Sequence, residues 1–373
     1  MKWYGDLAAG LCFRSVGSSY RRQKCEEASI GLERMRRSTL LLLLPRLADG
    51  LRGPWAGTQW DLCWQPPQQT ISYSDDLTRF AEKLLGAFRR APTVGLDCLG
   101  VLPCVARDSG MWLEFGVYKG GTIWRIALFR NQTRGSVGPL VHGFDSFHGL
   151  PETWRETQAL RPAGLRKGAF SLGGRPPFDE VDPIRWVPGW YNETLRPFLR
   201  AHKGEHVALL HVDSDLYSSA STIFAELGAK RLRPGCVIIF DELFNYREYM
   251  QHEMRALWEF LGRNTHLSIE VLGTSTQDVP MRPAQANVFQ AGAVRLVRRL
   301  GPAHSISRYS LAEQLEARGI SRADLRAELE RLPPERRGEA RREAAAAAAH
   351  GEQVAAPRPA ERRERRASKV NGR

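Results

Sequence analysis

The sequence predicts an α/β fold with a doubly wound, mostly parallel sheet and an antiparallel hairpin at one edge. Three observations lead to this prediction. From residue 111 onward, short apolar runs alternate with helical patterns, which is typical of a parallel sheet buried on both faces. Acidic residues follow four of the first five runs, and glycines follow the first. The last two runs have no helical pattern between them, which suits an edge hairpin.

Each predicted strand is an apolar run that ends at a turn or a polar residue. The expected strands are 112–117, 140–144, 184–187, 207–212, 236–240, 267–272 and 287–297. The expected helices are 74–90, 121–130, a short one that ends near residue 199, 218–232 and 248–261. The helix at 74–90 has apolar residues three and four apart, with Ser74 as its expected N-cap.

Basic residues are concentrated at the two ends of the chain. Of the net charge of +13, residues 1–60 carry a surplus of five and residues 331–373 a surplus of six, so the middle is nearly neutral. We expect an N-terminal extension, partly disordered, over 1–70 and a catalytic domain over 71–300. Small C-terminal helices over 301–332 and a disordered, basic Ala/Arg/Glu-rich tail over 333–373 would follow. Solvated tails account for the charge, so no specific nucleic-acid partner is expected.

The cysteines and the apolar runs bear on the compartment. The spacings of the six cysteines match no zinc or haem pattern, and the cysteines are too sparse for a disulfide scaffold, which fits a reducing compartment. Cys236 opens an apolar run and is expected to be a small buried residue. The run at 39–44 is too short to span a bilayer, so no transmembrane segment is predicted. We expect a cytoplasmic protein, or an organellar one if the basic first 37 residues form a transit peptide.

The loop after the first predicted strand has the features of a cofactor site. Ligands of open α/β sheets bind at the carboxyl ends of the strands. Gly116 lets backbone approach a ligand, Gly120 and Gly121 let the next helix begin close by, and Thr122 can hydrogen-bond a ligand at the helix N-terminus. Glu114 offers a carboxylate to a ligand that carries hydroxyls or an ammonium group.

The second predicted strand supplies the other half of this cofactor site. It ends at Asp145, which is placed to accept hydrogen bonds from ribose hydroxyls, and we include the adjacent Ser146 in the same set. The first loop lacks the G-x-G-x-x-G pattern of dinucleotide-binding folds, so a dehydrogenase is not favoured.

The strongest constellation is a set of four acidic residues after the fourth and fifth predicted strands. Hard divalent cations prefer carboxylate oxygens and leave positions open for water and substrate. Asp213, Asp241 and Glu242 are therefore the expected ligands of Mg²⁺ or another divalent cation. Asp215 is the candidate catalytic base for a substrate hydroxyl, but it equally suits a cap on the following helix.

Six segments, in this order along the chain, resemble the macrocin O-methyltransferase (TylF-like) family of class I, Rossmann-like, S-adenosylmethionine-dependent methyltransferases. They are EFGVYKGGT (114–122), GFDSFHGLPE (143–152), KGAF (167–170), GWYNETL (189–195), HVDSDLYSS (211–219) and PGCVIIFDE (234–242). The spacing of Asp213 from the Asp241–Glu242 pair is also similar to that of catechol O-methyltransferases, which place magnesium between the fourth and fifth strands.

The resemblance implies a role for each part of the site. The glycine-loop residues named above would contact the methionine portion of S-adenosyl-L-methionine, and Asp145 its ribose. The three expected metal ligands would hold magnesium, and residues 150–183 would form a substrate-covering loop. The acceptor would be a small-molecule hydroxyl, on a sugar or a glycosylated metabolite. Two departures from the family pattern concern the metal and the acceptor: Glu242 stands where Asp or Asn is common, and 173–177 is rich in glycine and proline.

Two alternatives come from other classes of protein. Asp213-Ser214-Asp215 is a D-x-D, which binds metal and diphosphate in nucleotide-sugar glycosyltransferases, but that function leaves the glycine loop and the Asp241–Glu242 pair unused. A non-catalytic, methyltransferase-like binding module need not retain four carboxylates at the strand ends. The sequence permits a homo-oligomer and does not identify the acceptor.

Overall fold

The computed structural model describes residue 63 and residues 70–105, 108–154, 165–279, 289–300 and 316–319 of the 373-residue chain. The chain divides into two units, Met1–Gln59 and Trp60–Arg373, and every described residue belongs to the second. The predicted N-terminal extension, C-terminal helices and basic tail therefore lie almost wholly outside the described residues and stay predictions. Within the described part of the chain, no helix has the length and apolar character required to cross a membrane.

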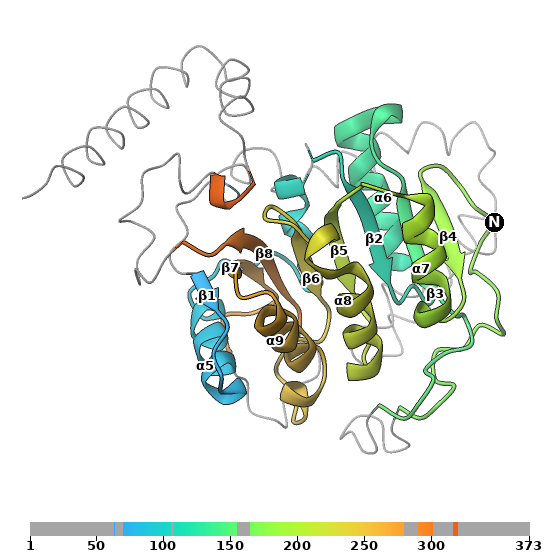
Figure 1. The fold of residues 1–373 in the computed structure, drawn as a ribbon. Coiled ribbons are helices and arrows are strands. Elements are labelled where there is room, and N and C mark those ends of the chain that lie inside the picture. Colours follow the sequence, from blue (N-terminus) through green and yellow to red (C-terminus); the bar gives the residue numbers. More distant parts are fainter. Residues whose placement is uncertain are drawn as a thin grey trace, which may run out of the picture. The chain divides into compact units, whose positions relative to one another are not determined.

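A mixed sheet forms the centre of this unit, with strand order β1-β7-β8-β6-β5-β2-β3-β4 (Figure 1). The strands are β1 (Thr70–Ser72), β2 (Met111–Phe115), β3 (Val141–Asp145), β4 (Ile184–Pro188), β5 (Val207–Val212), β6 (Val237–Phe240), β7 (Leu267–Thr274) and β8 (Gly292–Arg298). Strands β2 to β6 pair in parallel, whereas β8 is antiparallel to β6 and β7. The predicted fold class, with antiparallel strands towards one edge, is confirmed.

Helices cover both faces of this sheet (Figure 1). One face is covered by α5 (Leu77–Phe88), α7 (Tyr191–Ala201), α8 (Tyr217–Arg231) and α9 (Glu253–Arg263). The other is covered by α6 (Gly121–Arg134) and the 3₁₀ helix η1 (Leu99–Val105), while two short 3₁₀ turns, η2 (Gly135–Val137) and η3 (Tyr249–Gln251), lie in connections. Helices on both faces explain why the strands read as continuous apolar runs.

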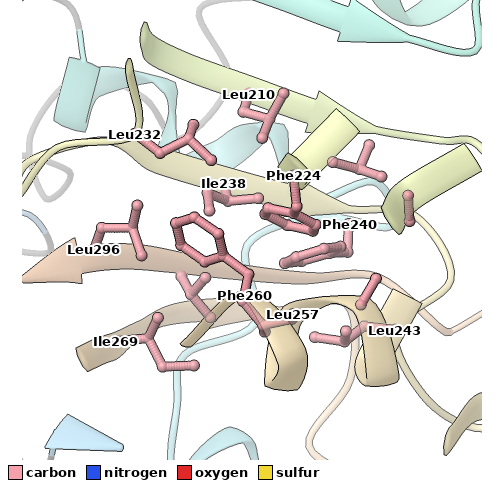
Figure 2. Close-up of a cluster of buried hydrophobic side chains, with 14 of the residues drawn as sticks. Leu210, Phe224, Leu232, Ile238, Phe240, Leu243, Leu257, Phe260, Ile269 and Leu296 are labelled. Atoms are coloured by element: carbon pink, nitrogen blue, oxygen red, sulfur yellow. The ribbon is translucent and has the colours of Figure 1, made fainter. Parts of the chain in front are cut away.

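The two cores hold the strand ends in place. On β5, Leu210 packs into the core beneath α8 and α9, and its neighbour Leu209 packs into the core beneath α6 and η1. Figure 2 shows the rings of Phe224, Phe240 and Phe260, from α8, β6 and α9, packed together in the first of these cores, which also holds Leu210. Each such side chain contributes roughly 1.5–3 kcal/mol when fully buried, so the carboxyl ends of β5 and β6 project from a rigid base.

Element boundaries differ from the predicted ones for local reasons. Helix α5 begins at Leu77 because the side chain of Asp76, not Ser74, accepts hydrogen bonds from the amides of Thr78 and Arg79. The predicted helix 248–261 is interrupted, since η3 ends at residue 251 and α9 begins at residue 253. The sequence also did not predict β1, which pairs antiparallel with β7 and forms the edge of the sheet beyond the hairpin.

Cys63 and Cys104 form a disulfide, which the cysteine spacing did not predict. The bond joins residue 63 to η1 across 41 positions of the chain. Cys98 and Cys236 are free and buried, as expected for Cys236. Disulfides are rare in compartments where thiols are kept reduced, so this bond argues against the reducing compartment that the sequence favoured. The compartment itself stays a prediction.

Candidate active site

The carboxyl ends of β2 and β5 approach each other very closely at Gly116. This residue has a φ of +89°, and a Cβ atom placed on it would lie only 1.7 Å from the carbonyl oxygen of Asp213. No side chain fits there, and the left-handed backbone also favours glycine. The sequence explained Gly116 by the approach of a ligand, whereas the structure shows that the backbone of the neighbouring strand end requires it.

The N-terminus of α6 is open at its first residue, Gly121, whereas the ring of Phe178 lies against Gly120. Gly120 has a φ of +77° and precedes the helix, and a Cβ atom on Gly121, the first helical residue, would have nothing within 4 Å. Thr122 follows, half-buried. The first turn of a helix presents unpaired amide groups, so this end of α6 can receive polar groups of a ligand.

Asp145, at the end of β3, organises the glycine loop. Its Oδ2 atom accepts hydrogen bonds from the amides of Val117 and Tyr118, both at 2.9 Å, and its Oδ1 atom accepts one from Phe147 at 2.7 Å. The carboxylate remains partly exposed and can accept further bonds. The neighbouring Ser146 is buried, and its hydroxyl accepts a hydrogen bond from the amide of His148, so it stabilises the turn.

Glu114 is a buried carboxyl without a hydrogen bond of normal geometry from any described residue. Burial raises its pKa well above the ordinary value, the backbone amide of Ile123 partly opposes this rise, and the carboxylates of Asp241 and Asp145 add to it. Its register partner on β5 is His211, whose Nδ1 atom lies 3.7 Å from its Oε2 atom. The sequence did not identify His211, because it occurs within an apolar strand. A buried carboxyl group without a hydrogen-bond partner lowers the stability of the fold, and a cationic group of a ligand would offset this loss.

Three carboxylates from the ends of β5 and β6 converge. One oxygen each of Asp213, Asp215 and Glu242 lies within 4.8 Å of the other two. The sequence proposed Asp213, Asp241 and Glu242 as the ligand set, whereas the group that meets this distance contains Asp215 and not Asp241. Asp241 follows β6 directly, and its amide donates a 3.0 Å hydrogen bond to the carbonyl of Val212.

The charges of this group suit a divalent cation. Burial raises the pKa values of Asp213 and Glu242 well above their ordinary values, and the carboxylates of Asp241 and Asp215 raise both further. The Oε2 atom of Glu242 is buried without a hydrogen-bond partner among the described residues. Negative charges this close disfavour the ionised form of each carboxyl, whereas a hard divalent cation binds such oxygen atoms and offsets the repulsion. The residues therefore fit Mg²⁺.

Asp215 is held in an unusual backbone conformation. Its φ is +62°, and the residue is buried. Helix α8 has Leu216 at its N-cap position, so Asp215 lies one residue before the place that a capping side chain occupies. The geometry therefore favours a role in the acidic group over the helix cap that the sequence left open.

Glu253, the first residue of α9, is a fifth carboxyl at this site, and the sequence did not identify it. It is fully buried, and Asp215 and Asp241 are close enough to raise its pKa above its ordinary value, after the larger effect of burial. The sequence did carry a signal for it. Glu253 shares the buried face of α9 with Leu257 and Phe260, where an apolar residue is expected.

Tyr191, at the start of α7, lies between the two halves of the site. Its ring contacts Phe115 edge-on, with ring centroids 5.2 Å apart. Burial raises the pKa of its hydroxyl well above the ordinary value, and the carboxylates of Asp145 and Asp213 raise it further. A hydroxyl close to both sets of acids is placed to contact a molecule that spans them.

Within the predicted covering loop, the described residues 150–154 and 165–170 pack near the start of α8, whereas Leu172 and Phe178 pack against the core beneath α6. Leu150, Trp154, Leu165 and Leu216 form a small buried cluster. The Trp154 ring also contacts the rings of Tyr246 and His252, at centroid distances of 6.2 and 6.5 Å. The loop therefore lies against segments that follow β5 and β6, as a substrate cover would.

Residues 104–262 match the family model of the macrocin O-methyltransferases (TylF). Over these residues, the match bears out the predicted resemblance to this family and the prediction of an S-adenosylmethionine-dependent methyltransferase. No curated relative matches the chain.

Solved methyltransferase structures resemble part of the chain. The calicheamicin methyltransferase CalS11 is 20% identical, with a TM-score of 0.38, and the match covers 60% of this chain and 95% of that chain. The O-methyltransferase NovP is 18% identical, with a TM-score of 0.34, and the match covers 59% and 99%. The methyltransferase MycE of mycinamycin biosynthesis, solved with Mg and SAH, is 16% identical, with a TM-score of 0.30, and the match covers 53% and 48%.

Proposed function

We propose that residues 104–262, which belong to the macrocin O-methyltransferase family, transfer a methyl group from S-adenosyl-L-methionine to a hydroxyl of a small molecule and use a divalent metal ion. One observation supports the metal above all. Three carboxylates meet within 4.8 Å, directly beside a second acidic set at the ends of β2 and β3. Two adjacent sites are what a methyl donor and a metal-held acceptor require.

The β2 and β3 ends are the proposed cofactor side. The buried Glu114 carboxyl would receive the ammonium group of the methionine portion, which would offset the cost of its burial. Asp145 would accept a hydrogen bond from a ribose hydroxyl of the cofactor while it continues to hold the glycine loop. The first turn of α6, at Gly121 and Thr122, would receive polar groups of the cofactor. S-Adenosyl-L-methionine supplies the electrophilic methyl group.

The β5 and β6 ends are the proposed acceptor side. Asp213, Asp241 and Glu242 would hold the metal ion, and Asp215 would lie beside it. A divalent cation supplies positive charge that favours ionisation of an acceptor hydroxyl. Asp215 is the group proposed to take the hydroxyl proton, because it is buried in the acidic group rather than at the helix cap. The family name supports a sugar or a glycosylated metabolite as the acceptor.

Binding measurements on the full chain test this proposal. We expect calorimetry to show binding of S-adenosyl-L-methionine and of Mn²⁺, and no binding of UDP-glucose. Asp213→Asn should abolish Mn²⁺ binding and leave cofactor binding intact. Glu205→Gln is the matched control, because Glu205 is exposed and precedes β5, at the opposite end of that strand from the site. Tight UDP-glucose binding without a response to S-adenosyl-L-methionine would instead indicate a glycosyltransferase.

A further inference from the structure

Residues 168–174, called the covering arm below, belong to the predicted covering loop and are held by hydrogen bonds to the turn after β3. The carbonyl of Phe147 accepts hydrogen bonds from the amides of Leu172 and Gly174, both at 2.9 Å. The amide of Phe147 in turn donates to the Oδ1 atom of Asp145 at 2.7 Å. The other oxygen of this carboxylate accepts two hydrogen bonds from the glycine loop. One carboxylate therefore connects the covering arm to the glycine loop, with a single residue between them.

The side chain of Phe170 provides a second connection between the same segments. Its ring lies edge-on to the ring of Tyr118 in the glycine loop, with centroids 5.4 Å apart. Phe170 also packs against the small buried cluster that contains Leu216, the residue after Asp215. It therefore contacts the proposed cofactor side through Tyr118 and lies against a cluster that borders the proposed acceptor side.

Three aromatic residues on these connections have an unusual backbone conformation. Tyr118, Phe147 and Phe170 have φ values of +47°, +56° and +66°. A left-handed backbone is rare for bulky side chains and persists only where the surrounding structure holds it, which is typical of ligand clamps and switch segments. The glycine loop, the turn after β3 and the covering arm thus each contain one residue that is held under strain.

We propose that Phe170 is a positioning residue, which transmits cofactor binding at Asp145 to the cover of the acceptor site. This inference rests on the proposed function, in which Asp145 receives a ribose hydroxyl. A ligand on this carboxylate restricts the group that anchors both the glycine loop and the covering arm, and the contact between the rings of Tyr118 and Phe170 passes the restriction of the loop to the arm. An acceptor then has less of the arm left to order, so the cofactor and the acceptor favour each other's binding.

Two substitutions remove the ring contact from opposite sides. Tyr118→Ala deletes one ring and leaves in place the backbone amide that donates to Asp145. Phe170→Leu deletes the other ring and keeps an apolar side chain against the buried cluster. Tyr118→Phe is the matched control, because it keeps the ring and loses only the hydroxyl. An edge-on aromatic pair changes an equilibrium by a factor of about 2–12, so this is the size of the effect that the contact can transmit.

The experiment measures amide hydrogen exchange of the covering arm in the full chain, without ligand and with saturating S-adenosyl-L-homocysteine, which carries the ribose and the ammonium group of the cofactor. Calorimetry on the same samples gives the dissociation constant of this ligand. In the wild type and in Tyr118→Phe, we expect the ligand to slow exchange at Leu172 and Gly174, whose amides bond to Phe147. In Tyr118→Ala and Phe170→Leu, the ligand should still bind, and the slowing should be about 2–12-fold smaller.

Each variant is compared with itself, with and without ligand, so a general loss of stability does not imitate the expected result. Slowing equal to that of the wild type in both ring-deletion variants would overturn the role of Phe170 and leave the proposed function standing. The same holds if the wild type binds S-adenosyl-L-homocysteine without any change of exchange in the covering arm. Failure of the wild type to bind this ligand would overturn both.

Discussion

Replacing Gly116 with alanine should damage the site far more than the fold. The new Cβ atom would lie 1.7 Å from the carbonyl oxygen of Asp213, and real Cβ atoms essentially never come closer than 3.0 Å to such an atom. The end of β5 would therefore have to move by about 1.3 Å, the difference between these two distances. Because Asp213 is one of the three converging acids, the displacement passes directly to the proposed metal site.

Two magnitudes follow from this geometry. The left-handed backbone at Gly116 costs an alanine about 1–2 kcal/mol, and in a domain of this size each kcal/mol lowers the melting temperature by roughly 2–4 °C. We therefore expect the melting temperature to fall by about 2–8 °C. A displacement of about 1 Å in a catalytic group can reduce turnover about 100-fold, so activity should fall by that order in protein that is still folded.

The assay pairs thermal unfolding with methyl transfer, and Gly86→Ala is the matched control. Gly86 lies within α5, away from the site, and the closest atom to its added Cβ would be 3.9 Å away on the flexible Arg90 side chain. This change should be neutral or stabilise the helix by up to about 1 kcal/mol. If Gly116→Ala retained wild-type turnover and Mn²⁺ affinity, the close contact between β2 and β5 would have no bearing on the site.

Three further predictions concern stability. Burial lowers the pKa of His142 to about 4, so the contribution of this residue to stability should fall by at most about 3 kcal/mol as the pH drops from about 6.5 towards 4. In pH-dependent denaturation, His142→Phe should remove this contribution relative to the wild type, and the exposed His266→Gln should not. Reducing the Cys63–Cys104 disulfide, which spans 41 positions, should lower the free energy of unfolding by up to about 4 kcal/mol, and identical denaturation curves with and without reductant would contradict this. Removing 331–373 should leave the melting temperature unchanged, since that segment has no apolar face; a large drop would show that it packs on the domain.

The sequence predicted the parallel part of the fold well because its signals are local. Strand β5 was predicted with the observed bounds, since an apolar run between a polar stretch and Asp213 marks both ends. Strand β1 was not predicted, because three residues carry no detectable period and the strand is defined by its pairing with β7, almost 200 positions away. The disulfide was missed for the same reason, since only the fold brings Cys63 to Cys104.

The site was predictable where chemistry follows a strand end, and not where it comes from the interior of an element. Asp213, Asp215 and Glu242 converge as expected for acids at neighbouring strand ends. The sequence could not show that the carboxyl of Asp215 would converge with those of Asp213 and Glu242, because the left-handed backbone of Asp215 is not evident from its residue type. His211 stands within an apolar strand, where a single polar residue gives no distinctive pattern, and Glu253 was overlooked although it occupies an apolar position of α9.

The central claim is a metal-dependent methyl transfer to oxygen, and turnover with labelled cofactor tests it most directly. The full chain would be incubated with tritiated S-adenosyl-L-methionine and small-molecule extract, with Mg²⁺ or with a chelator, and the labelled product identified. We expect label in a methyl ether only when Mg²⁺ is present. Full transfer in the chelator, or label on nitrogen, would contradict the role assigned to the acidic group at the ends of β5 and β6.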